Sequence, residues 1–276
     1  MILWSILIGL AICIVIGMPI SFGLAAISLF IFFESGYALS PIVSQAVNGL
    51  DSFPLLAIPL FILVGEVMSA GGIATRLVRL ASALVGFVAG GLGQVAVLTS
   101  MFFGGISGSA VADASAVGSM MIEPMKQHRY SAPMATAIVV AASVVGIIIP
   151  PSIPMIVYAI FATQANAPVK VEELFIAGFL PGVLIATAMI AFCIVVGWSF
   201  DRESFHLKKI ITAFADASWS LIVPVVILGG IYLGVFDTTA ASAIAVILAL
   251  VIEMFIHRSL TFDDLPGVMA ECGVLM

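Results

Sequence analysis

Two segments of this chain place hydroxyl side chains, small residues and prolines inside long apolar runs. The first covers residues 104–115, GGISGSAVADAS, and the second covers residues 146–154, GIIIPPSIP. Both interrupt helical patterns where a chain surrounded by lipid has no water to satisfy free backbone groups. Non-helical backbone at membrane depth persists only where it is packed in protein or lines a wet cavity. Two such breaks close together therefore predict a site for a polar or charged species that crosses the membrane.

The second segment leaves main-chain oxygens without helical partners. Pro150 has no N–H to donate to the carbonyl of Gly146, and Pro151 cannot donate to that of Ile147. Ile149 and Pro150 each precede a proline, which biases them away from helical geometry. Hard cations prefer oxygen ligands, and unwound carbonyls commonly coordinate Na⁺ in transporters with broken helices. Together with hydroxyls from the first segment, these oxygens predict a sodium site.

The first segment supplies those hydroxyl oxygens through Ser107 and Ser109, while its glycines and alanines allow close backbone approach. Asp113 lies near the start of the second helical half, where a carboxylate can cap exposed N–H groups. The N-terminus of such a half-helix is also a ready site for an anion. We assign Asp113 and Ser152 to substrate contact, and a purely structural capping role for Asp113 stays open.

Each segment also has a structural interpretation. A run of small residues is often only a close helix-packing face, and a proline in a membrane helix is often only a kink. The combination of both breaks with an embedded acidic residue favours a transport site over these simpler interpretations.

The composition sets the class of protein that must hold this site. The 276 residues are 63% hydrophobic and 9% charged, with a mean hydropathy of +1.30, whereas soluble domains carry about 25% charged residues. Apolar runs recur along the whole length, which predicts an all-α, polytopic helical membrane protein embedded in a lipid bilayer. The first run starts at Met1 without a basic segment before it, so we expect a retained helix. No basic face indicates a nucleic-acid partner.

The apolar runs give a layout of helices around the two breaks. Residues 2–33 are too long for one span and are interrupted at 17–19, so we expect two short spans there. Polar stretches at 34–51 and 201–216 separate apolar segments, the latter as an interfacial stretch. We expect the remaining helices near 54–70, 73–89, 93–127 (a hairpin around the first break), 131–149 with a continuation to about 162, 174–199, 217–235 and 239–256.

The basic residues support this layout. If the N-terminus faces outward and residues 93–127 enter and leave on one side, eight of the nine basic residues fall inside and only Lys170 lies outside. This bias is what the positive-inside rule expects. The inside set is Arg76, Arg79, Lys126, Arg129, Arg202, Lys208, Lys209 and Arg258.

A weak internal sequence similarity predicts how the chain is divided into parts. Residues 17–21 resemble residues 234–238, and transporters are often built from inverted repeats with broken helices. Carrying the first break forward by the same offset passes the last residue, so its partner is missing. We expect four parts: scaffold or arm helices (1–92), a transport-domain hairpin and broken helix (93–162), a connecting span with an interfacial arm (163–216), and an incomplete second repeat (217–276).

Other polar residues in the apolar runs receive simpler interpretations. Glu66 is deep enough to be a relay, but we favour a packing role for it, and Glu123 and Glu253 lie near predicted helix ends. The histidines at positions 128, 206 and 257 lie at helix ends or in connections, where we expect them to be solvated.

Three stretches give the chain a family resemblance: Gly104–Gly118, Ala141–Tyr158 and Gly229–Tyr232. It resembles the large membrane subunit of tripartite ATP-independent periplasmic (TRAP) transporters over nearly its whole length. The resemblance implies an elevator-type, sodium-driven importer of small organic anions, such as C4-dicarboxylates or sialic acid, in the bacterial inner membrane. It implies a small membrane subunit and a periplasmic substrate-binding protein as partners, with Na⁺ as coupling ion and no other cofactor.

The resemblance also implies sodium ligands, which carry over onto Ser107, Ser109, Gly146, Ile149 and Pro150. Family members are longer and possess a second hairpin with a second sodium site. Where they usually show a Pro-Thr-Glu-Ala-like stretch, this chain has residues 237–240, DTTA. We therefore expect a truncated chain.

Two other functions compete with transport. The sequence GISG at 105–108 matches the G-x-S-G pattern of rhomboid intramembrane serine proteases. That chemistry needs a base within reach of the nucleophile, and each histidine lies at or beyond a helix end, so we do not expect an enzyme. The other possibility is a non-transporting scaffold subunit or an inactive fragment.

Overall fold

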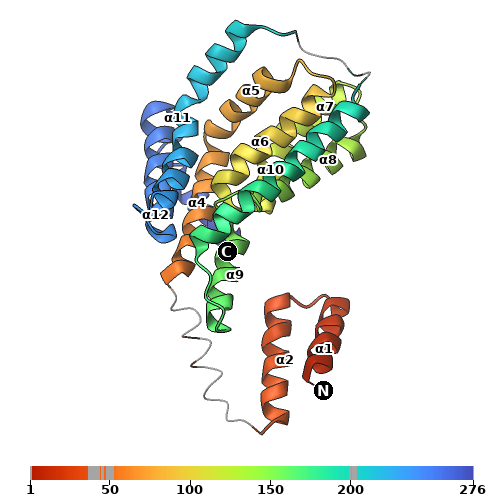
Figure 1. Ribbon diagram of the computed structural model, residues 1–276, viewed down its shortest axis with the longest axis vertical. Helices are drawn as coiled ribbons and strands as arrows, with labels where there is room; N and C mark the ends of the chain where they lie inside the picture. The colour runs from red at the N-terminus through yellow and green to blue at the C-terminus, as the bar shows by residue number, and fades with distance from the viewer. Residues whose placement is uncertain are drawn as a thin grey trace. The chain divides into compact units, whose positions relative to one another are not determined.

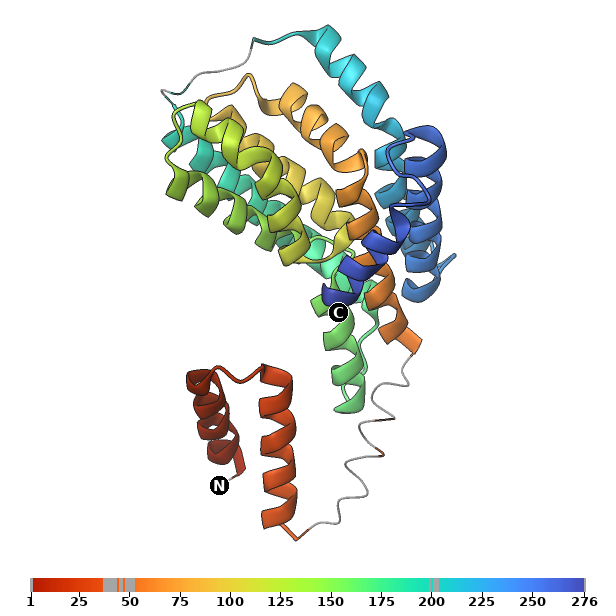
Figure 2. The same cartoon turned by 180° about the vertical axis from the view of Figure 1, so that it is seen from behind.

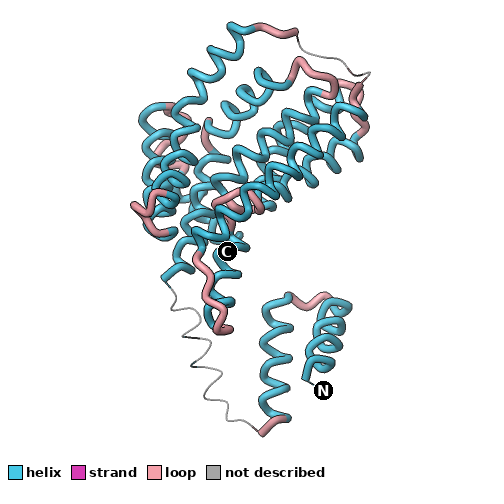
Figure 3. Tube along the Cα trace, in the orientation of Figure 1, coloured by secondary structure: helices cyan, strands magenta, loops and turns pink. Residues whose placement is uncertain are grey.

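The computed structural model describes residues 2–36, 44, 47, 53–198, 200 and 204–275. Every regular element within these ranges is a helix (Figure 3), which confirms the all-α prediction. The chain divides into two compact units, Met1–Ser52 and Phe53–Met276. Most of the polar stretch expected at 34–51 lies outside the described residues. The four-part division made from the sequence stays a prediction.

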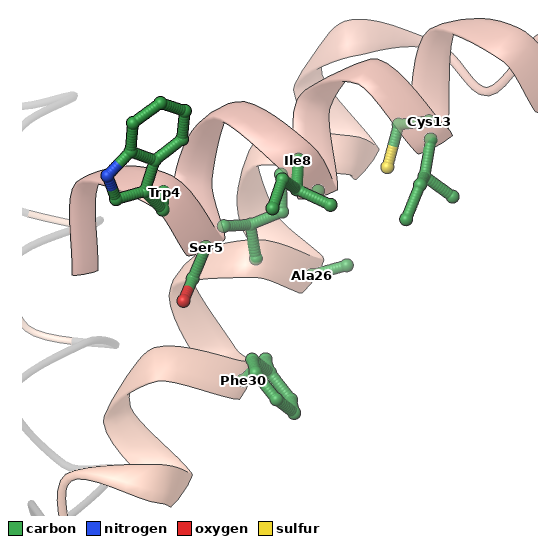
Figure 4. Close-up of a pocket in the computed structure, with 9 residues that line it drawn as sticks. Trp4, Ser5, Ile8, Cys13, Ala26 and Phe30 are labelled. Atoms are coloured by element: carbon green, nitrogen blue, oxygen red, sulfur yellow. The ribbon is translucent and has the colours of Figure 1, made fainter. Parts of the chain in front are cut away.

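The first unit is a pair of apolar helices. Helices α1 (Ile2–Ile16) and α2 (Ile20–Glu34) are separated at residues 17–19, which confirms the expected break. Gly17 has a φ of +77°, and Pro19 precedes the first turn of α2. A groove of about 630 Å³ runs between the helices, with Trp4 and Ile8 from α1 and Phe30 from α2 along it (Figure 4).

The second unit opens with a sharply bent helix pair. A 3₁₀ turn, η1 (Phe53–Leu56), leads into α4 (Ala57–Ala70), and α5 (Ile73–Val85) follows. The segments on either side of the break are inclined by 72°. The break falls at Gly71-Gly72, as the sequence predicted. Helix α5 ends four residues earlier than expected, because the glycines from Gly86 to Gly91 interrupt it.

The hairpin and the broken helix follow. Helices α6 (Gly91–Ser107) and α7 (Ala110–Gln127) form the hairpin, and α8 (Ala132–Gly146) packs against both of them (Figure 2). Helix α9 (Ile153–Gln164) resumes after the second break. Both breaks predicted from the sequence are therefore present.

Three long helices and a short one complete the unit. Helices α10 (Val171–Val196) and α11 (Leu207–Tyr232) are each long and apolar enough to cross a membrane. So is α12 (Thr238–Val251) together with the π-helical turn η2 (Ile252–Ile256). Helix α13 (Leu265–Leu275) comes last.

The second half of the polar stretch expected at 201–216 is helical, and its position at the membrane interface stays a prediction. Residues 207–216 are helical and continue directly into the expected span. Neither glycine nor proline occurs between Leu207 and Val223, so nothing interrupts the helix before Pro224.

The buried apolar side chains form two clusters that flank the hairpin. One contains Phe61 of α4, Phe103 of α6 and Phe175 of α10, all fully buried. The other joins α6, α7, α8 and α10 through residues such as Met121 and Val145. Large apolar side chains also cover the outer faces of the long helices, for example Leu184 and Phe192 of α10, which are more than half exposed. This distribution fits a polytopic membrane protein, whose outer surface faces lipid.

Candidate functional site

The tip of the hairpin is a two-residue interruption between α6 and α7. Gly108 adopts a φ of +62°, a conformation that glycine tolerates far better than other residues. Ser109 begins α7 as its N-cap, because its Oγ accepts a hydrogen bond from the Ala112 N–H at 3.4 Å. The Oγ of the fully buried Ser107 accepts the Ser109 N–H at 3.4 Å. Both predicted serines therefore lie at the tip.

The second break spans residues 147–152, between α8 and α9. Ser152 is the N-cap of α9 and accepts the Met155 N–H at 3.4 Å. Its hydroxyl also donates to the carbonyl of Ile147 at 2.5 Å. In the described part of the chain, no hydrogen bond reaches the carbonyl oxygens of Ile149 and Pro150. These two oxygens are among those that the sequence assigned to cation binding.

The two breaks touch. The Ile153 N–H donates to the carbonyl of Gly108 at 3.4 Å. A Cβ on Gly108 would lie 2.9 Å from the Pro151 oxygen, and one on Gly105 would lie 3.5 Å from the Pro150 oxygen. The hairpin tip is thus packed backbone to backbone against the proline segment, which places serine hydroxyls and unbonded carbonyls in one small region.

Beneath the tip, α6 and α8 cross without any side chain between them. A Cβ on Gly104 would overlap the Cα of Gly146. A Cβ on Gly146 would in turn lie 2.9 Å from the Gly104 Cα and 3.0 Å from Oδ2 of Asp113. Gly146 therefore serves as a contact point for the hairpin, which is a role that its position before the prolines did not reveal.

Asp113 has a different environment from the one that its position predicted. It does not cap α7, since Ser109 fills that role, and its side chain is fully buried against α8. Within the described residues neither of its carboxylate oxygens has a hydrogen-bond partner, and the same holds for the hydroxyls of Thr99 and Ser100. An isolated buried carboxylate is strongly unfavourable unless a cation or a proton compensates it. The buried carboxylate under the tip is therefore expected to hold a proton or to lie beside a cation.

A second buried polar cluster lies at the bend between α4 and α5. The carboxylate of Glu253, fully buried, accepts the N–H groups of Gly72 at 2.9 Å and Ile73 at 2.6 Å. His257 is 3.5 Å from the same carboxylate, and its side chain is 4% exposed. The expectation that His257 is solvated is therefore wrong. The chain folds back after η2, and this reversal could not be read from the apolar pattern.

Glu66 borders a cavity of about 490 Å³ between α4, α7 and α13. Glu271 of α13 lines the same cavity, as do Val111 and Ala112 in the first turn of α7. The N-terminus of a helix carries partial positive charge, which favours nearby carboxylates. The packing role expected for Glu66 stays a prediction.

Comparison with known proteins identifies the type of molecule. A family model described as "Tripartite ATP-independent periplasmic transporter, DctM component" matches residues 7–276. The chain belongs to this family. The resemblance noted from three stretches of the sequence is confirmed. The TRAP permeases are transport proteins, so the protease alternative is wrong.

Individual relatives show how much of a TRAP permease the chain represents. It is 38% identical over 268 residues to the "Isethionate TRAP transporter permease protein DctMQ" of Oleidesulfovibrio alaskensis, covering 95% of the chain and 41% of that protein. It is 33% identical to the "C4-dicarboxylate TRAP transporter large permease protein DctM" of Rhodobacter capsulatus, covering 96% and 63%. It is 32% identical to the "Sialic acid TRAP transporter large permease protein SiaM" of Vibrio cholerae, covering 92% and 60%. The chain therefore spans about 41–63% of the length of these relatives.

Proposed function

We propose that this chain forms part of the permease subunit of a sodium-coupled secondary transporter. The substrate is a small organic anion, which a periplasmic binding protein delivers to the permease and its small membrane partner in the bacterial inner membrane. The observation that carries the proposal is the contact between the two breaks, from the Gly108 carbonyl to the Ile153 N–H. This contact holds main-chain and hydroxyl oxygens together at a point where two apolar helices are interrupted.

Sodium suits this set of oxygens. The ligands we propose are Ser107 and Ser109 at the tip with Gly146, Ile149 and Pro150 in the broken helix. A hard cation with oxygen ligands needs neither thiolate nor imidazole, and the unbonded carbonyls of Ile149 and Pro150 supply what it requires. The buried carboxylate of Asp113 lies against Gly146 and can balance the charge of a cation held nearby.

An organic anion would bind at the capped helix ends. Ser109 begins α7 and Ser152 begins α9, and the N-termini of helices favour anions. Of the two residues assigned to substrate, Ser152 is the better placed, because a second negative charge at Asp113 would repel an anion unless Na⁺ is bound. That requirement links substrate binding to sodium.

The test is uptake by the complete transporter in liposomes, together with its partners. We expect import of an organic acid under an inward Na⁺ gradient, and equal uptake under a proton gradient without sodium would contradict the proposal. Replacing Pro150 and Pro151 by alanine should weaken the dependence on sodium, because alanine restores helical hydrogen-bond donors. The matched control replaces Pro181 and Pro224, which lie within continuous helices.

An unchanged sodium response in the Pro150→Ala/Pro151→Ala variant would remove the second break from the site. Correct membrane insertion without any uptake in the complete assembly would instead favour the scaffold alternative.

A further inference from the structure

The bend between α4 and α5 is built around one carboxylate. Glu253 of η2 is fully buried, and its two oxygens accept the N–H groups of Gly72 at 2.9 Å and Ile73 at 2.6 Å. A Cβ on Gly71 would overlap this carboxylate, and a Cβ on Gly72 would overlap the guanidinium of Arg76. The carboxylate therefore occupies space that a side chain at the bend would otherwise fill.

This carboxylate caps α5 from a distant part of the chain. The first N–H groups of a helix have no partners within the helix, and its N-terminus favours a negative charge. The N-cap residue of α5 is Gly72, whose side chain offers no acceptor. Glu253, which is 181 residues away in the sequence, satisfies these donors instead. Because α5 begins where α4 ends, at an inclination of 72°, the carboxylate fixes the position of the bend.

The turn that carries Glu253 is itself unusual. It is π-helical, and π turns within helices are frequent at functional sites. The chain reverses directly after it, where the Ser259 N–H donates to the carbonyl of Glu253 at 2.9 Å and Arg258 has a φ of +53°. The main chain and the side chain of Glu253 are thus both held, which keeps the carboxylate at the bend.

Helix α4 connects this bend to the tip of the hairpin. It lies between α12 and the hairpin helix α6 (Figure 1). About two helical turns before the bend, Gly65 of α4 faces the tip, where a Cβ would lie 2.8 Å from the Cβ of Ser107. Phe61, in the preceding turn, belongs to the same buried cluster as Phe103 of α6. A displacement of α4 at the bend would therefore disturb the surroundings of Ser107.

We propose that Glu253 is a positioning residue: by locking the bend, it holds α4 against the hairpin tip and keeps Ser107 in the geometry that sodium requires. The sodium part of this inference rests on the proposed function, whereas the link from the bend to the tip does not. Glu253 itself contacts the first turn of α5 and none of the proposed ligands. Its loss should therefore change the sodium requirement rather than remove the site.

The test combines hydrogen–deuterium exchange of the purified complete permease with uptake by the complete transporter in liposomes. Glu253→Gln keeps the shape, but its amide nitrogen cannot accept an N–H. Exchange should accelerate by roughly tenfold at the bend (71–73) and also at the tip (107–112), because a hydrogen bond to a charged group contributes about this factor. The sodium concentration for half-maximal uptake should rise roughly threefold to tenfold, with maximal uptake per folded transporter unchanged. A residue with only a structural role would lower the amount of active protein and leave the half-maximal concentration unchanged.

A second variant reaches the same carboxylate from the other side and keeps the test decisive if Glu253→Gln does not fold. Gly71→Ala displaces the carboxylate without changing Glu253, so it should have both effects, and the double variant should add little to either. Two controls should leave exchange and sodium response unchanged. Glu123→Gln alters an exposed carboxylate, and Gly229→Ala adds a Cβ that meets nothing within 4 Å.

The two readouts separate this inference from the proposed function. Faster exchange that is confined to the bend, or no change at the bend, would overturn the inference and leave sodium coupling intact. Faster exchange at the tip with an unchanged sodium requirement would overturn the link between Glu253 and sodium. If the unmodified transporter needs no sodium, the proposed function fails, and exchange at the tip still decides whether Glu253 positions the hairpin.

Discussion

Asp113 is the buried acidic residue beside the junction of the two breaks. Its carboxylate is fully buried, and the Ser100 hydroxyl is a neighbouring donor that falls short of hydrogen-bond geometry. The buried hydroxyl of Thr99 on α6 is also without a partner among the described residues. The sequence identified the residue and its half-helix, but a cap and a ligand are indistinguishable at that level. The structure excludes the cap, because Ser109 fills that position, and a ligand role for Asp113 stays a prediction.

Replacing Asp113 by asparagine keeps the shape and removes the charge. We expect the sodium concentration for half-maximal uptake to rise by roughly tenfold or more, since interactions with a charged group are worth about 1.5–3 kcal/mol. The melting temperature without sodium should stay equal or increase, because asparagine carries no charge that burial could penalise. Glu123→Gln is the control, since that carboxylate is exposed and pairs with Lys126. A sodium response like that of the unmodified protein would exclude Asp113 from the cation site.

His257 gives the fold a dependence on pH. Burial lowers the pKa of His257 below its usual 6.5, the charge of Arg76 lowers it further, and Glu253 and Asp216 oppose both effects. The unfolded chain therefore takes up a proton at a higher pH than the folded protein does. Stability should decrease as the pH falls below about 6.5 and level off below the folded-state pKa.

The measurement is thermal unfolding between pH 7.5 and pH 5. His257→Gln should flatten the profile in this range. His206, which is exposed, provides the matched control as His206→Gln. A slope that persists unchanged in His257→Gln would assign the effect to another group.

The sequence predicted where helices are interrupted better than it predicted how far a helix extends. The breaks at 17–19, 71–72, 108–109 and 147–152 were all predicted from the sequence. Glycine frees the backbone locally, and proline restricts it and removes a hydrogen-bond donor. The extension of α11 back to Leu207 was missed, since charge was taken to mark a connection although nothing there stops a helix. The burial of Glu253 was missed because it depends on Gly72 and Ile73, which are distant in sequence.

The crossing of α6 and α8 can be tested by adding one methyl group. Gly146→Ala places a Cβ 2.9 Å from the Gly104 Cα, so we expect stability to fall by about 1–3 kcal/mol, as for other overpacked interiors. In Gly229→Ala of α11 the new Cβ meets nothing within 4 Å, and helix propensity should raise stability by about 0.5–1 kcal/mol. Denaturant unfolding in detergent compares the two. Equal effects of the two substitutions would show that the glycine contact is dispensable.

Over the molecule as a whole, the arrangement of charge predicts which ends of the helices share a side of the membrane. Lys126 and Lys209 belong to the basic majority, whereas Lys170 precedes α10 on the opposite side. The orientation of the helices in the membrane is predicted from the positions of the basic residues in the sequence.

Single cysteines at these positions provide the test, in a background in which Cys13, Cys193 and Cys272 are replaced. A membrane-impermeant maleimide added to intact spheroplasts should label Lys170→Cys and spare Lys126→Cys and Lys209→Cys. Opened membranes should make all three reactive. Labelling of all three in intact spheroplasts would refute the layout.

The backbone contact between Gly104 and Gly146 also governs how the molecule can move. Two packed helices can slide past each other when the side chains between them change rotamer. At the crossing of α6 and α8 no side chain lies between the two glycines. The hairpin and α8 must therefore travel as a single block. Any displacement has to be absorbed outside that block, for example in residues 165–170 after α9, because Gly90 before α6 is itself packed against the backbone of Cys193 and Gly197. If the permease moves as proposed, a substitution that stiffens residues 165–170 should slow transport without changing the proposed binding residues.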